Sequence, residues 1–172
     1  YKSVENKNIL LIGGGTGMGR SIALALAESG AKVAISGRRM EMLKSTADKL
    51  ESDQTIFCKQ ADVTNRQSLE SLFEWFDKTV GNLDCLIHAA GINVALRSMQ
   101  ELSPEDWDKL IEINLTGSYN VLRLALDRMR PNKRGQIILV NSVAGRRSVP
   151  LGGIGYNASK FGLTGLGVGL AE

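Results

Sequence analysis

The sequence has few of the residues that cross-link small proteins or hold metals. Among its 172 residues are two cysteines, Cys58 and Cys85, and one histidine, His88. The cysteines lie far apart and share no metal-ligand spacing with the histidine. We therefore expect two reduced, buried thiols, no metal site, and a histidine that serves the core at the end of a buried strand. A hydrophobic content of 43% is enough to build a core without disulfide bonds or metals.

Long hydrophobic runs and runs of one charge are also missing. No segment approaches the roughly 20 apolar residues that cross a membrane, and the first eight residues lack a signal-peptide pattern. The net charge is +3, but Lys and Arg are spread among acidic residues without interleaved aromatics. We expect a cytoplasmic protein that binds neither nucleic acid nor membrane.

The chain has about the length of one domain. Residues 1–172 contain no linker, repeat or low-complexity tract, so we expect a single domain. The sequence starts without Met and stops inside a stretch with helical pattern. We expect a C-terminally truncated or partly ordered chain.

Short apolar runs rich in β-branched residues alternate with stretches of helical period. This alternation predicts an α/β fold, in which parallel strands are joined by right-handed helical crossovers. The predicted strands are Asn8–Ile12, Lys32–Ser36, Thr55–Gln60, Leu83–His88 and Gln136–Asn141. The predicted helices are Gly17–Ser29, Arg39–Glu51, Arg66–Val80, Pro104–Met129 and Gly155–Ala171.

A glycine-rich turn separates the first predicted strand from the first predicted helix, with the spacing Gly13-x-x-x-Gly17-x-Gly19. Glycine lets the backbone turn tightly and approach a pyrophosphate, while a helix N-terminus offers unpaired N–H groups and partial positive charge. The turn therefore indicates a dinucleotide site. The alternative is a flexible connection that binds nothing.

Tyr156 and Lys160 lie four positions apart in the last predicted helix and so share one face of it. Bringing a phenol, whose ordinary pKa is about 10, into proton exchange near neutral pH takes roughly 4 kcal/mol in favour of the phenolate. A cation about 4 Å away supplies roughly that much when shielded from water, and only about 1 kcal/mol in bulk water. The pair predicts a sheltered proton-transfer site. Ser142, at the end of the fifth strand, is expected at the same sheet edge as the glycine turn.

Together these segments resemble the classical short-chain dehydrogenase/reductase family, and within it the 3-oxoacyl-carrier-protein reductase-like members. The glycine spacing is that of the family, with Ile12 in place of its Thr. Residues 88–91 resemble the family's Asn-Ala-Gly stretch, with Ala89 in place of Asn, and residues 142–145 match its Ser-x-Ala-Gly segment. The resemblance implies a Rossmann-type, doubly wound parallel sheet with helices on both faces, lacking its C-terminal strands.

The resemblance also implies an NADP(H)-dependent oxidoreductase that interconverts a ketone and a secondary alcohol, with a small-molecule carbonyl or alcohol as substrate. Tyr156 would exchange a proton with the substrate oxygen, Lys160 would favour the phenolate and hold the nicotinamide ribose, and Ser142 would orient the substrate oxygen. Asn114 would position a water that relays protons to Lys160. The implied catalytic residues are Asn114, Ser142, Tyr156 and Lys160. The implied cofactor-binding residues are Gly13, Thr16, Gly17, Met18, Gly19, Arg38, Arg39, Asp62, Val63, Ala90, Gly91, Tyr156 and Lys160.

The residues after the second strand favour NADP(H) over NAD(H). An acid there would bind the ribose hydroxyls of NAD, but this chain has Arg38 and Arg39, which suit a 2′-phosphate. The alternative is that both arginines are solvated at a helix start. Asp62 resembles the family's adenine contact, although taken alone it is better explained as the N-cap of a turn.

Small residues at helical spacing, Ala158, Gly162, Gly165 and Gly169, line one side of the last predicted helix. We expect them at the interface of a homodimer or homotetramer, with packing on the chain's own sheet or long helix as the alternative. Residues 146–147 are two arginines that we expect to be solvated, with contact to an anionic substrate such as an acyl carrier as the alternative.

Two other functions remain as alternatives. A non-catalytic, redox-sensing nucleotide-binding module would keep the glycine turn and discard the chemistry, which the retained catalytic residues argue against. A methyltransferase would have a similar sheet, but normally carries an acid after the second strand.

Overall fold

Five short segments that contain β-branched residues form one parallel sheet in the computed structural model, which describes residues 4–171. The strands are β1 (Asn8–Ile12), β2 (Lys32–Gly37), β3 (Ile56–Gln60), β4 (Cys85–His88) and β5 (Gln136–Leu139). Their order in the sheet is β3-β2-β1-β4-β5, and every neighbouring pair is parallel. The chain therefore runs outward from β1 in one direction and returns to add β4 on the other side. This reversal places a ligand-binding crevice at the carboxyl ends of β1 and β4.

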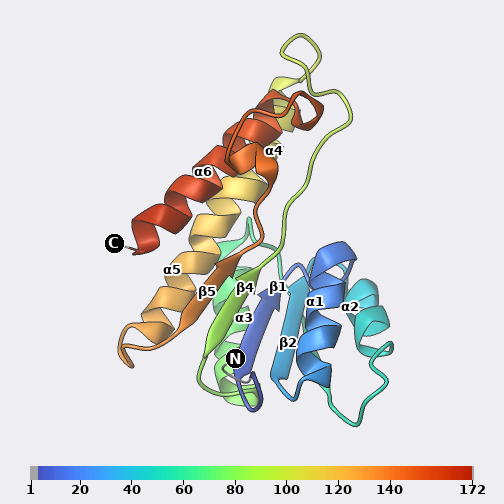
Figure 1. The fold of residues 1–172 in the computed structure, drawn as a ribbon, viewed down its shortest axis with the longest axis vertical. Helices are drawn as coiled ribbons and strands as arrows, with labels where there is room; N and C mark the ends of the chain where they lie inside the picture. The colour runs from blue at the N-terminus through green and yellow to red at the C-terminus, as the bar shows by residue number, and fades with distance from the viewer. Residues whose placement is uncertain (1–3, 172) are drawn as a thin grey trace.

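Helices cover the sheet (Figure 1). They are α1 (Gly17–Glu28), α2 (Met40–Ala47), α3 (Arg66–Thr79), α4 (Pro104–Ile111), the π turn η1 (Glu112–Thr116), α5 (Gly117–Met129), the 3-10 turns η2 (Val143–Gly145) and η3 (Pro150–Gly152), and α6 (Ile154–Ala171). Side chains alternate along each strand, so β1 sends Ile9 and Leu11 to a cluster that includes α1 and α2. Leu10 and Ile12 join the cluster that includes α3 and α5. The doubly wound fold predicted from the sequence is confirmed.

The long helix predicted over Pro104–Met129 is interrupted by η1. A π turn inserts one extra residue into a helix and is often found at functional sites. Hydrophobic periodicity does not register a single inserted residue, so the prediction of an unbroken α-helix was wrong. The turn carries Asn114, whose side chain reaches across to the loop after β4.

Several boundaries also differ from the prediction. α2 ends at Ala47 rather than Glu51, because the N–H groups of Lys49 and Leu50 bond to carbonyls three residues back, as in a turn. β5 ends at Leu139, so the chain is already in a loop where it passes the functional residues that follow.

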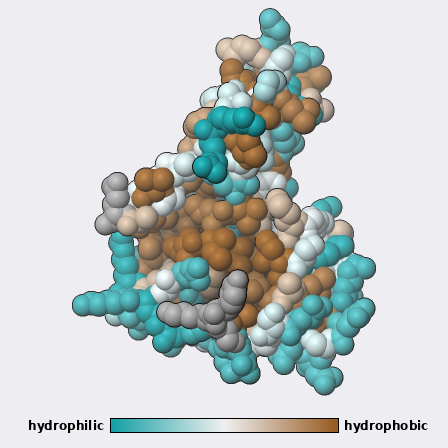
Figure 2. Space-filling model, in the orientation of Figure 1, coloured by the Kyte–Doolittle hydropathy of each residue, from teal (hydrophilic) through white to brown (hydrophobic). Residues whose placement is uncertain are grey.

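Part of the sheet's surface is apolar and open. Figure 2 shows hydrophobic residues gathered at the centre of this view, where Figure 1 has β4 and β5. Ile138 of β5 is 40% exposed, and no residue of this strand is fully buried. Among residues 4–171, none of the helices is both long enough and apolar enough to span a bilayer.

Candidate active site

The glycine turn packs against the end of β4 without room for side chains. Gly13 has φ +92°, and a Cβ there would lie 2.7 Å from the backbone nitrogen of Ala90. A Cβ on Gly19 would lie 2.1 Å from the carbonyl oxygen of Gly13. The N–H groups of Gly13 and Gly14 both donate to the carbonyl of Ser36, at 2.7 and 3.2 Å. The turn is thus a fixed cradle of bare backbone at the start of α1, and it fits the pyrophosphate of a dinucleotide.

Two side chains that the sequence did not indicate hold this turn from behind. The Thr46 hydroxyl lies 3.1 Å from the Gly14 carbonyl oxygen and 3.2 Å from that of Gly15. Arg20 donates through Nη2 to the Gly15 carbonyl (2.8 Å) and through Nε to the Thr46 hydroxyl (3.1 Å). The signal was weak, because Thr46 lies on α2, far from the turn in sequence.

A cavity of about 280 Å³ lies between the turn and the ends of β1, β2 and β4. Gly17 does not line it. With φ +51° and nothing within 4 Å of its Cβ position, Gly17 serves the backbone path into α1 rather than a close contact. The residues with predicted cofactor contacts that line this cavity are Gly13, Thr16, Met18, Gly19, Arg38, Arg39, Asp62, Val63, Ala90 and Gly91.

Charged groups at the far end of this cavity are Arg38, Arg39 and Asp62. Both arginines are exposed, and within the described part of the chain neither belongs to an ion pair. Asp62 accepts through Oδ1 from the N–H of Thr64 (3.0 Å) and from its hydroxyl (2.9 Å), so it does cap a turn. One carboxylate oxygen of Asp62 thereby organises the loop at the wall of the cavity.

Tyr156 and Lys160 line a second cavity, of about 440 Å³, together with Ser142. Met18, Ala89, Gly91 and Ile92 line both cavities, so the two adjoin. The proton-transfer pair and the glycine turn therefore open onto one continuous crevice at the carboxyl edge of the sheet, as the strand ends predicted.

Lys160 is buried and lacks an acidic partner in the described residues. It is 5% exposed, and its Nζ donates to the Val140 carbonyl at 3.3 Å. Burial lowers the pKa of Lys160 from its ordinary value. Its Nζ lies 5.6 Å from the centre of the Tyr156 ring, and a Cβ on Gly91 would lie 3.6 Å from it. The ammonium is thus sheltered from water above the Tyr156 ring, and shelter is one of the conditions that the sequence argument required.

Asn114 is 1% exposed and ties η1 to the loop after β4. Its Oδ1 accepts from the Ile92 N–H (2.8 Å), while its Nδ2 donates to the Ile92 carbonyl (2.9 Å) and to the Ser159 hydroxyl (3.1 Å). The side-chain amide thus uses both of its N–H donors and one lone pair of Oδ1, and a water held by Asn114 would need the remaining lone pair of Oδ1 or the backbone carbonyl. That carbonyl already accepts from the Ser118 hydroxyl at 2.7 Å.

Ser142 follows β5 and caps η2. Its Oγ accepts from the N–H of Ala144 at 3.1 Å, which fixes the oxygen at the cavity wall. Because the cap uses a lone pair, the hydroxyl proton stays free to be donated toward the cavity.

Supporting contacts around α6 were not found by sequence reasoning. Asn157 accepts from the Val149 N–H (2.8 Å) and donates to the Val149 and Gly153 carbonyls. Asn141 donates to the Thr164 hydroxyl (2.8 Å), which in turn donates to the Gly145 carbonyl (2.7 Å). These bonds clamp the loops on either side of Ser142 to α6. Polar residues inside an apolar helix were the only available signal.

His88 lies in the core, as its position in the sequence indicated. Its Nε2 is 2.8 Å from the Ser118 hydroxyl, and burial lowers its pKa to about 4. Its Nδ1 is buried and lacks a hydrogen-bond partner among residues 4–171, so one of the two ring nitrogens is satisfied in the core. At neutral pH this ring is uncharged.

Arg146 and Arg147 are exposed and line neither of the two cavities. The arginine that lines the cavity with Ser142, Tyr156 and Lys160 is Arg97, which the sequence reasoning did not single out.

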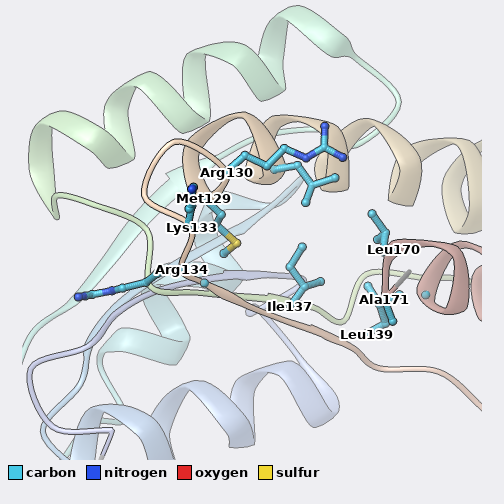
Figure 3. A pocket seen from close by; sticks show the side chains of 11 residues that line it. Met129, Arg130, Lys133, Arg134, Ile137, Leu139, Leu170 and Ala171 are labelled. Carbon is cyan, nitrogen blue, oxygen red and sulfur yellow. The ribbon is translucent and has the colours of Figure 1, made fainter.

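A further cavity of about 560 Å³ lies away from these residues, between the ends of α5 and α6 and the strand β5. Figure 3 shows Met129, Ile137, Leu139 and Leu170 around it. It contains neither the glycine turn nor the phenol, so it has no part in the chemistry proposed below.

Comparison with known proteins agrees with this arrangement. Residues 7–172 match the family described as short chain dehydrogenase. An uncharacterized oxidoreductase of Listeria monocytogenes is 35% identical over 168 residues, which are 95% of this chain and 66% of that protein. An uncharacterized oxidoreductase of Staphylococcus aureus is 31% identical over 142 residues, which are 83% of this chain and 61% of that protein.

Solved structures show the same fold. An NAD+-bound xylitol dehydrogenase has a TM-score of 0.91 at 26% identity, over 96% of this chain and 64% of its own. Actinorhodin polyketide ketoreductase with NADPH has a TM-score of 0.87 at 29% identity, over 93% of this chain and 62% of its own. The chain thus spans between 61% and 66% of the length of these four relatives. By the match of its sequence over residues 7–172, the chain belongs to the short-chain dehydrogenase family.

Proposed function

We propose that the protein is an oxidoreductase that interconverts a ketone and a secondary alcohol with NADP(H). The observation that carries the proposal is the meeting of Ser142, Tyr156 and Lys160 in one cavity that adjoins the glycine turn. A nicotinamide dinucleotide bound in this crevice would supply or accept the hydride.

Each catalytic side chain has a role that its surroundings support. The Ser142 hydroxyl donates to the substrate oxygen and orients it, because its own oxygen is fixed by the Ala144 N–H. The Tyr156 phenol gives its proton to that oxygen in reduction and takes it back in oxidation. The buried ammonium of Lys160 favours the phenolate form.

Asn114 would position a water that relays protons to Lys160. Its side-chain amide holds the loop after β4 in place through two hydrogen bonds to Ile92. Gly91 keeps this region open: a Cβ there would lie 3.4 Å from the Asn114 Oδ1 and 3.6 Å from the Lys160 Nζ.

The preference for NADP(H) rests on Arg38 and Arg39. Both line the cofactor cavity without a carboxylate partner in the described part of the chain, so their guanidinium groups are free for a 2′-phosphate. The similar structures do not decide the question, because the ketoreductase holds NADPH and the xylitol dehydrogenase holds NAD+. The narrower assignment to 3-oxoacyl-carrier-protein reductases stays a prediction.

The small-residue side of α6 supports the proposal of a homodimer or homotetramer in part. A Cβ on Gly162 would lie 2.8 Å from Leu115, so this part of the stripe packs on the chain's own η1. Gly165 and Gly169 have nothing within 4 Å of their Cβ positions and line an apolar groove of about 360 Å³ beside α5. The outer half of the stripe is therefore available to a second copy. Light scattering of the purified protein tests this, with a monomer as the contradicting result.

A panel of ketones and secondary alcohols with NADPH, NADH and their oxidised forms tests the proposed reaction. Turnover would appear as a change in the absorbance of the reduced nicotinamide, faster with NADPH than with NADH. Nucleotide binding without turnover of any compound would instead favour the redox-sensing module.

A further inference from the structure

Two loops join beside the catalytic cavity and fix Arg97 in its wall. The N–H of Ile154 donates to the Arg97 carbonyl at 3.0 Å, and Arg97 donates through Nη1 to the Leu151 carbonyl at 3.0 Å. Asn93 donates through Nδ2 to the Gly152 carbonyl at 3.1 Å. The loop after β4 and the loop before α6 therefore form one bonded unit.

Close packing holds the same contact from the other side. Gly153 has φ +73°, and a Cβ there would lie 2.4 Å from the Cβ of Arg97. Only glycine fits, so the two backbones touch at Arg97. The guanidinium is consequently carried on a defined backbone rather than on a free loop.

The bonds of this guanidinium leave its charge unmatched. Nε donates to the Ala95 carbonyl at 3.3 Å and Nη1 to the Leu151 carbonyl at 3.0 Å, and both acceptors are neutral. Among residues 4–171 the ion pairs are Arg128 with Asp77 and Arg134 with Asp84. A guanidinium carries five N–H donors. The donors that Arg97 does not use on the backbone, including those on Nη2, remain for a ligand.

The cavity around Arg97 is positively charged. Of the described residues that line it, the charged ones are Arg97 and Lys160, and none is acidic. Lys160 is buried and engaged with the Val140 carbonyl beside Tyr156. Arg97 is therefore the charged group left to select a substrate.

From this geometry, and resting on the function proposed above, we propose that the substrate is a keto acid, and in the reverse direction a hydroxy acid, whose carboxylate binds Arg97. The planar guanidinium fork matches a carboxylate through two parallel hydrogen bonds. The carbonyl oxygen then lies at Ser142 and Tyr156 in the same cavity of about 440 Å³.

The chemistry leaves the carboxylate unchanged. In reduction the carbonyl π bond breaks, its carbon gains a C–H bond from the hydride, and its oxygen gains the proton of Tyr156. The substrate takes up two electrons, and the reduced nicotinamide loses them.

Paired substrates test the inference. Acetoacetate, 4-oxopentanoate and 5-oxohexanoate are each compared with their methyl esters, which keep the ketone and remove the charge. Rates are measured for the wild type, for Arg97→Met and Arg97→Lys, and for Arg146→Met, a control at an exposed arginine that lines neither cavity.

We expect the wild type to prefer at least one acid over its ester. Arg97→Met should lower kcat/KM about 10- to 100-fold more for that acid than for its ester, because the charged hydrogen bonds to the substrate are lost only with the acid, whereas the loop contacts are lost with both. Arg97→Lys should recover part of the loss, and Arg146→Met should behave as the wild type.

The ester in the same variant separates binding from loop structure. If Arg97→Met lowers acid and ester equally, Arg97 serves only the loop contact and the inference is overturned. Esters or neutral ketones reduced as well as the acids by the wild type would also overturn it, while leaving the proposed oxidoreductase intact. If no carbonyl compound is reduced at all, the proposed function fails and this inference with it.

Discussion

The Nε2 atom of His88 lies 2.8 Å from the hydroxyl oxygen of Ser118, and that hydroxyl lies 2.7 Å from the carbonyl oxygen of Asn114. Because the carbonyl can only accept, the hydroxyl must donate to it and so accepts from the imidazole. The ring is therefore the neutral tautomer with its proton on Nε2. A chain of two hydrogen bonds connects the end of β4 to the backbone of η1.

This arrangement predicts an imidazole that stays neutral well below its ordinary range. Burial, with the nearby Lys160 charge as a smaller cause, lowers the pKa of His88 from 6.5 to about 4. Since the chain has one histidine, its ring gives one set of NMR signals. Those signals should show no protonation midpoint between about pH 8 and about pH 5, because the lowered pKa lies below this range. A midpoint near the ordinary value would contradict the hydrogen-bond chain.

The same shift predicts how stability depends on pH. The unfolded chain binds a proton at His88 as pH falls below 6.5, whereas the folded chain does so only near 4. Between these values the unfolded state holds more protons, so lower pH favours unfolding. Above pH 6.5 the neutral His88 imposes no loss of unfolding free energy. Toward pH 4 the folded state loses roughly 3 kcal/mol of unfolding free energy relative to that range, because only the unfolded chain is protonated at His88. Urea unfolding across this window should show the slope in the wild type and lose that part of it in His88→Gln.

Ser118→Ala should destabilise the fold. The substitution leaves the buried Nε2–H of His88 without an acceptor, which costs about 1–3 kcal/mol of unfolding free energy. The matched control is Ser29→Ala, which removes an exposed hydroxyl bonded only to the Ala25 carbonyl. Equal urea midpoints for the two variants would show that the bond to His88 contributes nothing.

Two glycine-to-alanine substitutions should differ in their effect on NADPH binding. A Cβ on Gly19 would lie 2.1 Å from the Gly13 carbonyl oxygen, so Gly19→Ala must displace the cradle and weaken NADPH binding by about tenfold or more. A Cβ on Gly169 meets nothing within 4 Å, so Gly169→Ala should leave binding unchanged and stabilise α6 by up to about 1 kcal/mol. Fluorescence titration with NADPH measures cofactor binding by the two variants. Unchanged binding by the Gly19 variant would exclude the glycine turn as the cofactor site.

Arg38→Ser should change the choice of cofactor. Loss of a charge-assisted bond to the 2′-phosphate is expected to weaken NADPH binding by about 10- to 100-fold and to leave NADH binding nearly unchanged. Arg147→Ser, at an exposed arginine away from the cofactor cavity, is the control. Tighter binding of NADH than of NADPH by the wild type would contradict the assignment.

The sequence predicted the sheet and the catalytic edge because both depend on local patterns. β-branched runs mark the strands, and residues that follow strand ends meet at one edge of a parallel sheet. The pairing of Tyr156 and Lys160 could be predicted for the same reason, because the two residues lie one helical turn apart. These positions need no knowledge of which distant segments touch.

The contacts that hold the site in place could not be predicted from the sequence, because each joins segments that are far apart along the chain. Thr46 bonds to the glycine turn from α2, and Arg97 meets the loop before α6. The sequence does not distinguish a threonine or arginine that hydrogen-bonds to distant backbone from one that is exposed to solvent. The π turn at Asn114 escaped detection because one inserted residue hardly alters the hydrophobic pattern. Arg146 and Arg147 follow Ser142 in sequence, but both are exposed and line neither cavity, in agreement with the expectation that they are solvated.

The central claim is that Tyr156 exchanges the proton while the rest of the crevice binds the cofactor. Tyr156→Phe removes one hydroxyl and keeps the ring that lies 5.6 Å from the Lys160 Nζ. The most direct measurement is the single-turnover rate of ketone reduction by this variant, with NADPH binding measured on the same sample. We expect the rate to fall about 100- to 10,000-fold with NADPH binding nearly unchanged. A rate equal to that of the wild type would contradict the account.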